Sequence, residues 1–225
     1  MLALGHRWGI IYRTVGRQEE TVSGKETHAG DGHQARTRIA NAAISLFARK
    51  GFTGTSMREI AEAAGVTKPT VYYYFGSKVG LGHAIVEEAR ALQDELIAEE
   101  TGKGGSVMER LVGFIVAHYR GCEEHEALAR FLYGLTFSPV ESELRLDVEG
   151  FRKAAAETLS GILDDAVAGG VIRREVREEA DLVLMGIVNM HLMASLHLGL
   201  ALSQGLAERS VRLFLEGVRS KVGED

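Results

Sequence analysis

Apolar residues recur along this chain at the three- and four-residue spacing of helices, and alternating β-branched runs are missing. The first apolar stripe places Ile39, Ala43 and Phe47 on one face of a helix that begins near Ala35 and that Gly51 ends. The same spacing predicts further helices over residues 57–64, 68–75, 78–100, 106–120, 123–136, 142–168, 176–201 and 205–221. The pattern therefore predicts an all-α fold.

Two of these helices are short and carry clear start and stop signals. Ser56 and Glu59 have the spacing of a capping box, and Gly65 supplies the left-handed residue that ends the same helix. Thr67 can cap the next helix. Pro69 is tolerated in the first turn of that helix, because an N–H group at this position would have no partner within the helix. Two short helices joined by a three-residue glycine turn are typical of a helix-turn-helix.

The charge is distributed unevenly along the chain. The whole chain has a formal charge of −5, which by itself argues against a nucleic-acid partner, because phosphate binding needs clustered Lys and Arg. Residues 33–83, however, contain seven basic and two acidic residues, whereas residues 84–225 contain fifteen basic and twenty-five acidic residues. A small basic module therefore precedes a large acidic one.

These differences divide the chain into three expected parts. Residues 1–32 show no periodicity, and we expect a flexible tail without assigned function, with a DNA-contacting arm as the alternative. Residues 33–93 form the expected DNA-binding domain with a three-helix helix-turn-helix, and residues 94–225 form a second helical domain. The glycine-rich segment 102–105 breaks the long helix after Ser77 but lacks the residue order of a phosphate-binding loop.

The second helix of the helix-turn-helix carries the side chains that suit DNA. Its polar start can touch base edges in the major groove, and its three consecutive tyrosines can donate to phosphates, although at least one must pack inward. Val71 and Phe75 are expected in the core. Lys78 lies near unpaired N–H groups at a helix start, and Arg58 can reach a guanine or a phosphate. The candidate DNA contacts are Arg58, Thr67, Lys68, Pro69, Thr70, Tyr72, Tyr73, Tyr74 and Lys78.

Residues 35–85 resemble the tetracycline-repressor (TetR) family of bacterial transcriptional regulators. The resemblance is carried by Arg38-Ile39 to Phe47, Gly51-Phe52, Thr55-Ser56, Ile60-Ala61, Ala64-Gly65-Val66, Val71-Tyr72, Phe75 and Lys78-x-x-Leu81. It implies a homodimer whose C-terminal domain binds a small molecule and dimerises. It adds Ser56 to the DNA contacts above, and Tyr74 stands where many relatives have His.

The C-terminal domain contains an unusually apolar stretch. Residues 182–207 include no Asp, Glu, Lys or Arg, but their polar residues and flanks do not fit a membrane anchor. Together with the resemblance, this predicts a dimer interface over residues 176–221, where Gly186, Ala194 and Gly199 allow close approach. Two recognition helices on a two-fold axis predict a near-palindromic operator with half-sites roughly 34–36 Å apart.

Aromatic and polar residues of the C-terminal domain are candidates for a ligand pocket. They are Phe114, His118, Tyr119, Cys122, Phe131, Tyr133, Phe137 and His191. His118, Cys122 and His125 also have a spacing that suits a metal, but Gly121 interrupts the helix, and we favour ordinary packing. We predict neither a metal nor a cofactor.

The sequence as a whole predicts a cytoplasmic, nucleoid-associated regulator. Its single cysteine cannot form an internal disulfide, and its N-terminus does not resemble a secretory signal. We expect a repressor that a small molecule releases from DNA, with the helix over residues 78–100 carrying the coupling. A DNA-binding protein without a ligand and a helical metal-dependent enzyme are the alternatives, and no catalytic motif supports the enzyme.

Overall fold

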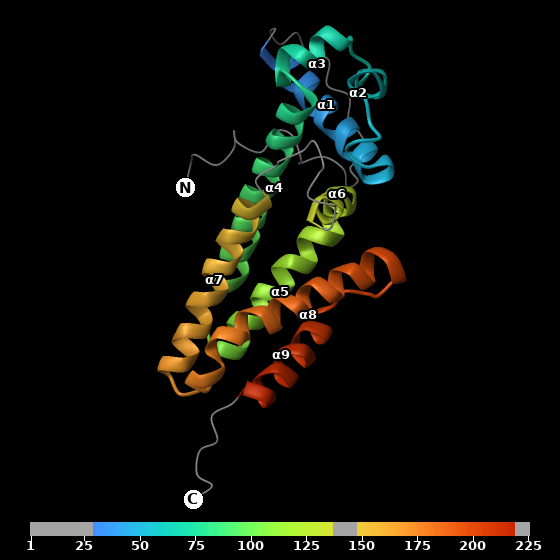
Figure 1. Cartoon of the computed structure of the whole chain (residues 1–225). Helices are drawn as coiled ribbons and strands as arrows, with labels where there is room; N and C mark the ends of the chain where they lie inside the picture. The colour runs from blue at the N-terminus through green and yellow to red at the C-terminus, as the bar shows by residue number, and fades with distance from the viewer. Residues whose placement is uncertain (1–28, 137–147, 219–225) are drawn as a thin grey trace, which may run out of the picture. The chain divides into compact units, whose positions relative to one another are not determined.

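The computed structural model describes residues 29–136 and 148–218, and helices account for nearly all of both ranges (Figure 1). Within them the chain is all-α, without a strand, as the sequence predicts. The elements are α1 (Ala29–Lys50), α2 (Met57–Ala64), α3 (Lys68–Phe75), α4 (Lys78–Thr101), α5 (Val107–Glu124), α6 (Glu126–Thr136), α7 (Val148–Ala168), the 3-10 turn η1 (Arg174–Val176), α8 (Arg177–Leu198) and α9 (Gln204–Val218).

Local signals set most of the helix ends. Ser56 and Ser106 each form a capping box, with Glu59 and Glu109 respectively, and open α2 and α5. The first boundary differs from the prediction, since α1 begins at Ala29 and the segment 29–32 belongs to a helix and not to a tail. The predicted beginning of α7 at residue 142 lies outside the described residues.

The chain forms two compact units that do not coincide with the two predicted domains. Unit 1 comprises residues up to Arg90 together with the stretch from Ala127 to the end of α6, and unit 2 comprises Ala91–Glu126 and the chain from Glu149 onward. The division within α4 lies close to the predicted boundary after residue 93. Helix α6, however, belongs to unit 1, although the sequence placed it in the C-terminal domain.

Unit 1 is built on the buried face of α1. Helices α1, α2 and α3 contact one another and group around the beginning of α4 (Figure 1). The Phe47 ring lies 5.0 Å from that of Phe52 and 4.9 Å from that of Phe131 on α6. This aromatic contact explains why α6 joins unit 1, because burying large rings together is favourable.

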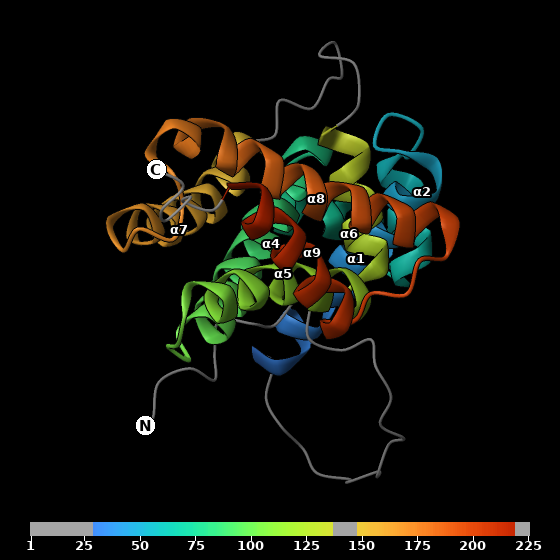
Figure 2. The same cartoon turned by 90° about the horizontal axis from the view of Figure 1, so that it is seen from below.

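Unit 2 is built around α5, whose Leu111, Phe114 and Ile115 are fully buried. Figure 2 shows α8 and α9 next to each other and in front of α5, and both contact it. Helix α4 approaches α5 so closely that a Cβ atom added to Gly113 would lie 2.6 Å from the carbonyl oxygen of Glu100. Only glycine therefore fits at this position without a shift of the backbone.

Helix α8 is apolar on much of its exposed surface. With η1 it forms, in the part of the chain that the structure describes, the one helix long and apolar enough to cross a membrane, and 22% of its most apolar window is buried. Leu182, Val183 and Met190 are exposed, whereas Leu184, Val188 and Leu192 are buried. The helix thus has one apolar face inside unit 2 and another that is exposed in the described part of the chain.

Candidate nucleic-acid interface

The beginning of α2 is held by a network that includes Ser56, one of the predicted DNA contacts. The Ser56 hydroxyl donates to the Glu59 carboxylate at 2.8 Å, and the Ser56 amide donates to the same oxygen at 2.9 Å. The Lys50 ammonium donates to Glu59 at 2.6 Å. These bonds, the one from Lys50 first, lower the pKa of Glu59 to about 2. Ser56 thus acts as a cap whose hydroxyl hydrogen is already engaged.

The turn between α2 and α3 has the geometry of a helix-turn-helix. Gly65 adopts φ 64° and ψ 37°, the left-handed conformation that the sequence predicts for it. The Val66 amide donates to the Ala61 carbonyl at 3.0 Å, and Ala61 is buried. The turn is therefore closed by backbone bonds and fixes the direction in which α3 leaves α2.

The first turn of α3 is ordered by its own threonines. Thr67 caps the helix, with its hydroxyl accepting from the Thr70 amide at 3.4 Å and lying 2.8 Å from the Thr70 hydroxyl. Val71 and Phe75 are buried, as predicted, whereas Lys68 and Pro69 are exposed. The polar start of α3 is thus pre-ordered and open to solvent.

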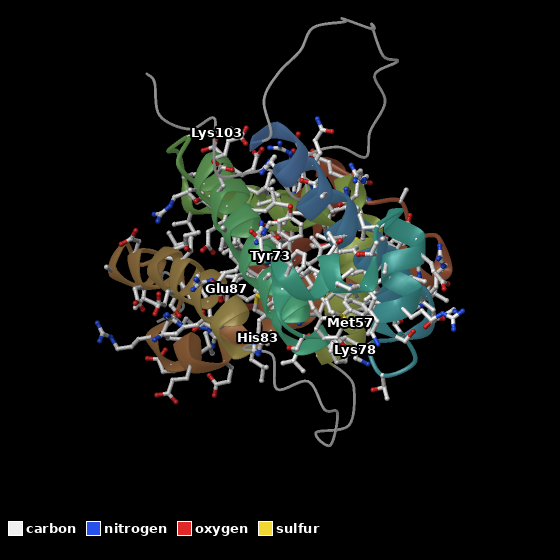
Figure 3. The ribbon with its side chains drawn as sticks, turned by 90° about the horizontal axis from the view of Figure 1, so that it is seen from above. Met57, Tyr73, Lys78, His83, Glu87 and Lys103 are labelled. Carbon is white, nitrogen blue, oxygen red and sulfur yellow. The ribbon has the colours of Figure 1, made fainter. Side chains whose placement is uncertain are left out.

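The three tyrosines differ in exposure. Tyr73 is 82% exposed and Tyr72 43% exposed, whereas Tyr74 is half-buried. A Cβ atom added to Gly32 would lie 3.2 Å from the Tyr74 hydroxyl, so the first turn of α1 borders this residue. Tyr74 is therefore the inward tyrosine that the helix geometry requires. Figure 3 shows Tyr73 on α3.

Lys78 has a different environment from the predicted one. Its ammonium donates to the carbonyl oxygens of Phe52 and Thr55, both at 3.0 Å, and lies 4.6 Å from the centre of the Phe52 ring. The sequence suggested that Lys78 uses its charge beside free N–H groups, but here the charge ties the α1–α2 loop to α4.

Arg58 forms a contact that the candidate set did not include. Its Nε atom donates to Glu62 at 2.7 Å, and this bond raises the pKa of Arg58. Both side chains are exposed. The i,i+4 spacing of Arg58 and Glu62 is the signal by which the sequence alone reveals this pair.

Lys68 on α3 contacts an aromatic ring of the same helix. Its ammonium lies 5.7 Å from the centre of the Tyr72 ring.

Some of the predicted pocket residues come together in unit 2. The Tyr119 hydroxyl lies 2.5 Å from Nδ1 of His191, which joins α5 to α8. Burial raises the pKa of Tyr119 to about 12 and lowers that of His191. Nδ1 of His118 lies 2.8 Å from the Phe114 carbonyl, and burial lowers the pKa of His118. These groups are therefore uncharged polar groups in an apolar surrounding.

Other predicted pocket residues lie elsewhere. Phe131 and Tyr133 belong to α6 in unit 1, and Phe131 packs against Phe47 as a core residue. Phe137 lies outside the described residues. The contact with Phe47 was not predicted, because the sequence does not reveal that α6 packs on α1, and the pocket itself stays a prediction.

The described residues hold no group of three His, Cys, Asp or Glu side chains that suits a metal ion. Among the three residues whose spacing could suit a metal, His118 hydrogen-bonds to the Phe114 carbonyl, and Cys122 is buried and not part of a disulfide. His125 follows α5 as its C-terminal cap residue. The spacing of His118, Cys122 and His125 thus does not produce a metal cluster in the described part of the chain.

Comparisons with known proteins agree with this geometry. Residues 39–85, from the buried face of α1 to the beginning of α4, match the family model of bacterial regulatory proteins of the tetR family. The probable HTH-type transcriptional regulator YttP of Bacillus subtilis (strain 168) is 33% identical over 100 residues, which cover 44% of this chain and 48% of that protein. The chain thus spans about half the length of this relative.

Two longer matches extend into the second unit. The HTH-type transcriptional repressor KstR2 of Mycobacterium tuberculosis (strain CDC 1551 / Oshkosh) is 26% identical over 159 residues, covering 69% of this chain and 76% of that protein. The crystal structure of the TetR family transcriptional regulator PfmR from Thermus thermophilus superposes with a TM-score of 0.63 at 25% identity. That match covers 84% of this chain and 98% of the other.

Proposed function

We propose that this chain, which belongs to the TetR family of bacterial regulatory proteins, represses transcription by binding a specific DNA operator as a homodimer. The observation that carries the proposal is the start of α3, where Lys68, Pro69 and Tyr73 are exposed on a capped helix-turn-helix. The surrounding segment 33–83 has an excess of five basic residues. A short exposed helix in a basic module suits the major groove.

The side chains at this site would divide their work between bases and phosphates. Thr67, Lys68, Pro69 and Thr70 contact base edges, because the N-terminal end of a recognition helix enters the groove. Tyr72 and Tyr73 donate their hydroxyls to phosphates. Ser56, Arg58 and Tyr74 lie at the edge of the same surface, and Lys78 acts mainly by holding the loop that precedes α2.

Dimerisation would account for the exposed apolar face of α8. Leu182, Val183 and Met190 expose apolar surface that a second copy can cover, and residues 176–221 form the proposed interface. Two heads on a two-fold axis would read half-sites roughly 34–36 Å apart in a near-palindromic operator.

A small molecule bound in unit 2 would oppose DNA binding. Phe114, His118, Tyr119, Cys122 and His191 supply apolar surface with a few neutral polar groups, which suits an uncharged part of a ligand. Ligand and DNA then favour different states of the dimer, and each lowers the affinity for the other. We infer a regulatory and not a catalytic role, in the cytoplasm.

The proposal is tested by selecting binding sites from a random DNA library with the full chain. We expect enrichment of a near-palindromic sequence. Lys68→Ala or Thr70→Ala should relax the preference at particular base pairs by about 1–3 kcal/mol. Tyr73→Phe, which removes only a hydroxyl directed at phosphate, should weaken binding to all sequences alike. The proposal fails if no sequence is enriched, or if all three variants lose affinity equally on every sequence.

A further inference from the structure

The two acidic residues of the basic module both lie on α2. Glu59 and Glu62 are the only Asp or Glu residues in the segment 33–83. Glu59 caps the helix through Ser56. The Glu62 side chain is exposed and, within the described residues, forms a single contact, the bond from Arg58 at 2.7 Å. An exposed pair of this spacing adds little to stability. Folding therefore does not account for the negative charge of Glu62.

A carboxylate at this place opposes DNA binding in general. Helix α2 contacts α3, and the first helix of a helix-turn-helix crosses the DNA backbone (Figure 1). If the Arg58 guanidinium lay on a phosphate, the bonded Glu62 carboxylate would come close to that phosphate and be repelled. A guanidinium that lies on the edge of a base meets only partial charges. The pair of Arg58 and Glu62 thus suits a base better than a phosphate.

The bond to Glu62 leaves the end of the Arg58 guanidinium open. Only Nε donates to Glu62, and the Arg58 side chain is 80% exposed. Its two Nη groups bond no other residue in the described ranges. They present two parallel N–H donors, which match the O6 and N7 acceptors of guanine in the major groove. Because Nε is anchored, the plane of the guanidinium and the direction of both donors are restricted.

We propose that Arg58 reads one guanine in each half-site and that Glu62 is the positioning residue that orients it. This inference rests on the proposed operator binding and adds to it a base pair that is read from α2 and not from α3. Holding the long Arg58 side chain in one orientation before DNA arrives reduces the entropy cost of the contact. An arginine without this anchor bonds nearby phosphates as well as bases and discriminates less. Glu62 thus lowers general affinity for DNA and raises selectivity at one base pair.

Two full-length variants separate the orientation of Arg58 from the charge of Glu62. Glu62→Ala removes the charge and the acceptor, whereas Glu62→Gln removes the charge but keeps an oxygen that can accept from Nε. Both variants should bind random-sequence DNA about two- to fivefold more tightly at the same salt concentration, since each lacks one negative charge. In binding-site selection from a random library, only Glu62→Ala should weaken the preference for guanine at one position of each half-site, by about five- to tenfold.

Arg58→Ala identifies the base pair concerned. It should remove the guanine preference at the same position and weaken binding in general, because a positive charge is lost. Adding Glu62→Ala to Arg58→Ala should change that preference no further, since the two residues act as one unit. The matched control is Glu157→Ala on α7, which breaks an exposed pair of the same i,i+4 spacing with Lys153. The control should select the same sequence as the wild type.

The role of Glu62 is contradicted if Glu62→Ala keeps the full guanine preference that Arg58→Ala loses. The reading of a guanine by Arg58 is contradicted if Arg58→Ala weakens binding to all sequences alike, which would place the guanidinium on a phosphate. In both cases the wild type still selects an operator, and the proposed function stands. A wild-type chain that selects no sequence would instead contradict the proposed function itself.

Discussion

At the scale of single residues, the polar side chains of the basic module bond mainly to their own chain. Thr67 and Thr70 bond to each other, and Lys78 bonds the carbonyls of Phe52 and Thr55. Such bonds keep the start of α3 in one conformation before DNA arrives. Pre-ordering lowers the entropy cost of binding, so in the proposed DNA complex these residues would contribute to affinity even where they touch no base.

The capping network of Ser56, Glu59 and Lys50 predicts a pH-dependent stability. The pKa of Glu59 is lowered from 4.5 to about 2, chiefly by the bond from Lys50. A carboxylate with a lowered pKa stabilises the folded state at pH values above its unfolded pKa and loses this effect as the pH falls through the folded pKa. Glu59→Gln should therefore lower the free energy of unfolding at pH 7, with the difference shrinking between pH 4.5 and about 2.

Urea unfolding followed by circular dichroism at several pH values measures this difference. Glu123→Gln, at an exposed position on α5, is the matched control and should leave the free energy of unfolding nearly unchanged. A gap between wild type and Glu59→Gln that stays constant down to the lowest pH would show that the carboxylate charge is not what stabilises the beginning of α2.

At the scale of helices, local signals predicted the helix-turn-helix well, because caps and turn glycines act within a few residues. Distant contacts explain the failures. Gly121 suggested that α5 ends at residue 120, yet the helix runs to Glu124, and a Cβ atom at Gly121 would lie 3.0 Å from Oε1 of Gln93. This glycine serves the packing of α5 against α4. Likewise, the segment 29–32 has weak helix propensity, but it forms the first turn of α1 beside Tyr74.

At the candidate DNA-binding site, too, local signals were predictable from the sequence and distant contacts were not. The sequence identified which part of the chain faces solvent at α3, because the alternation of buried Val71 and Phe75 with polar neighbours follows helix geometry. It did not identify the partners of Lys78, which lie 23 and 26 positions earlier in the chain. Contacts of this range depend on how helices pack, and no local pattern encodes them.

Replacement of glycine by alanine is expected to have opposite effects on stability at two helical positions. Gly113 lies where α4 and α5 approach, and an alanine there would place its Cβ 2.6 Å from the Glu100 carbonyl oxygen. Gly113→Ala should destabilise the protein by about 1–3 kcal/mol, because backbone has to move. Gly161 on α7 has no neighbour within 4 Å of the same atom. Gly161→Ala should stabilise the protein by about 0.5–1 kcal/mol through helix propensity.

Thermal and urea unfolding of both variants check this pair of predictions, and each variant is the control of the other. If Gly113→Ala is as stable as the wild type, then α4 and α5 do not approach as closely as the structure has them. If both substitutions stabilise the protein, helix propensity alone would govern both positions.

At the scale of the whole molecule, the net charge of −5 conceals an excess of positive charge in the segment that holds the helix-turn-helix. DNA responds to the local potential and not to the average, so the basic module can attract phosphates while the acidic remainder keeps the protein soluble. One such module offers few contacts. Strong binding to an operator therefore favours two of them, and in the proposed homodimer the exposed apolar face of α8 would join the two copies.

A charge placed on that face predicts the loss of the dimer and, with it, of the operator. Met190 is 67% exposed, so Met190→Lys should leave the fold of the single chain intact. In the proposed dimer the new ammonium would be buried against apolar side chains, which is costly without a partner charge. We expect a monomer by sedimentation, about 100-fold weaker binding to the two-half-site operator, and little change on a single half-site.

Ala156→Lys adds the same charge at an exposed position on α7 and should change neither association nor DNA binding. Comparing the two variants separates the effect of location from that of net charge, which is identical in both. A Met190→Lys protein that stays dimeric and keeps its operator affinity would show that another surface joins the copies. A different outcome would assign the apolar face of α8 to a membrane surface. In that case the wild-type chain partitions into lipid vesicles, whereas Met190→Lys, with a charge on the same face, stays in solution.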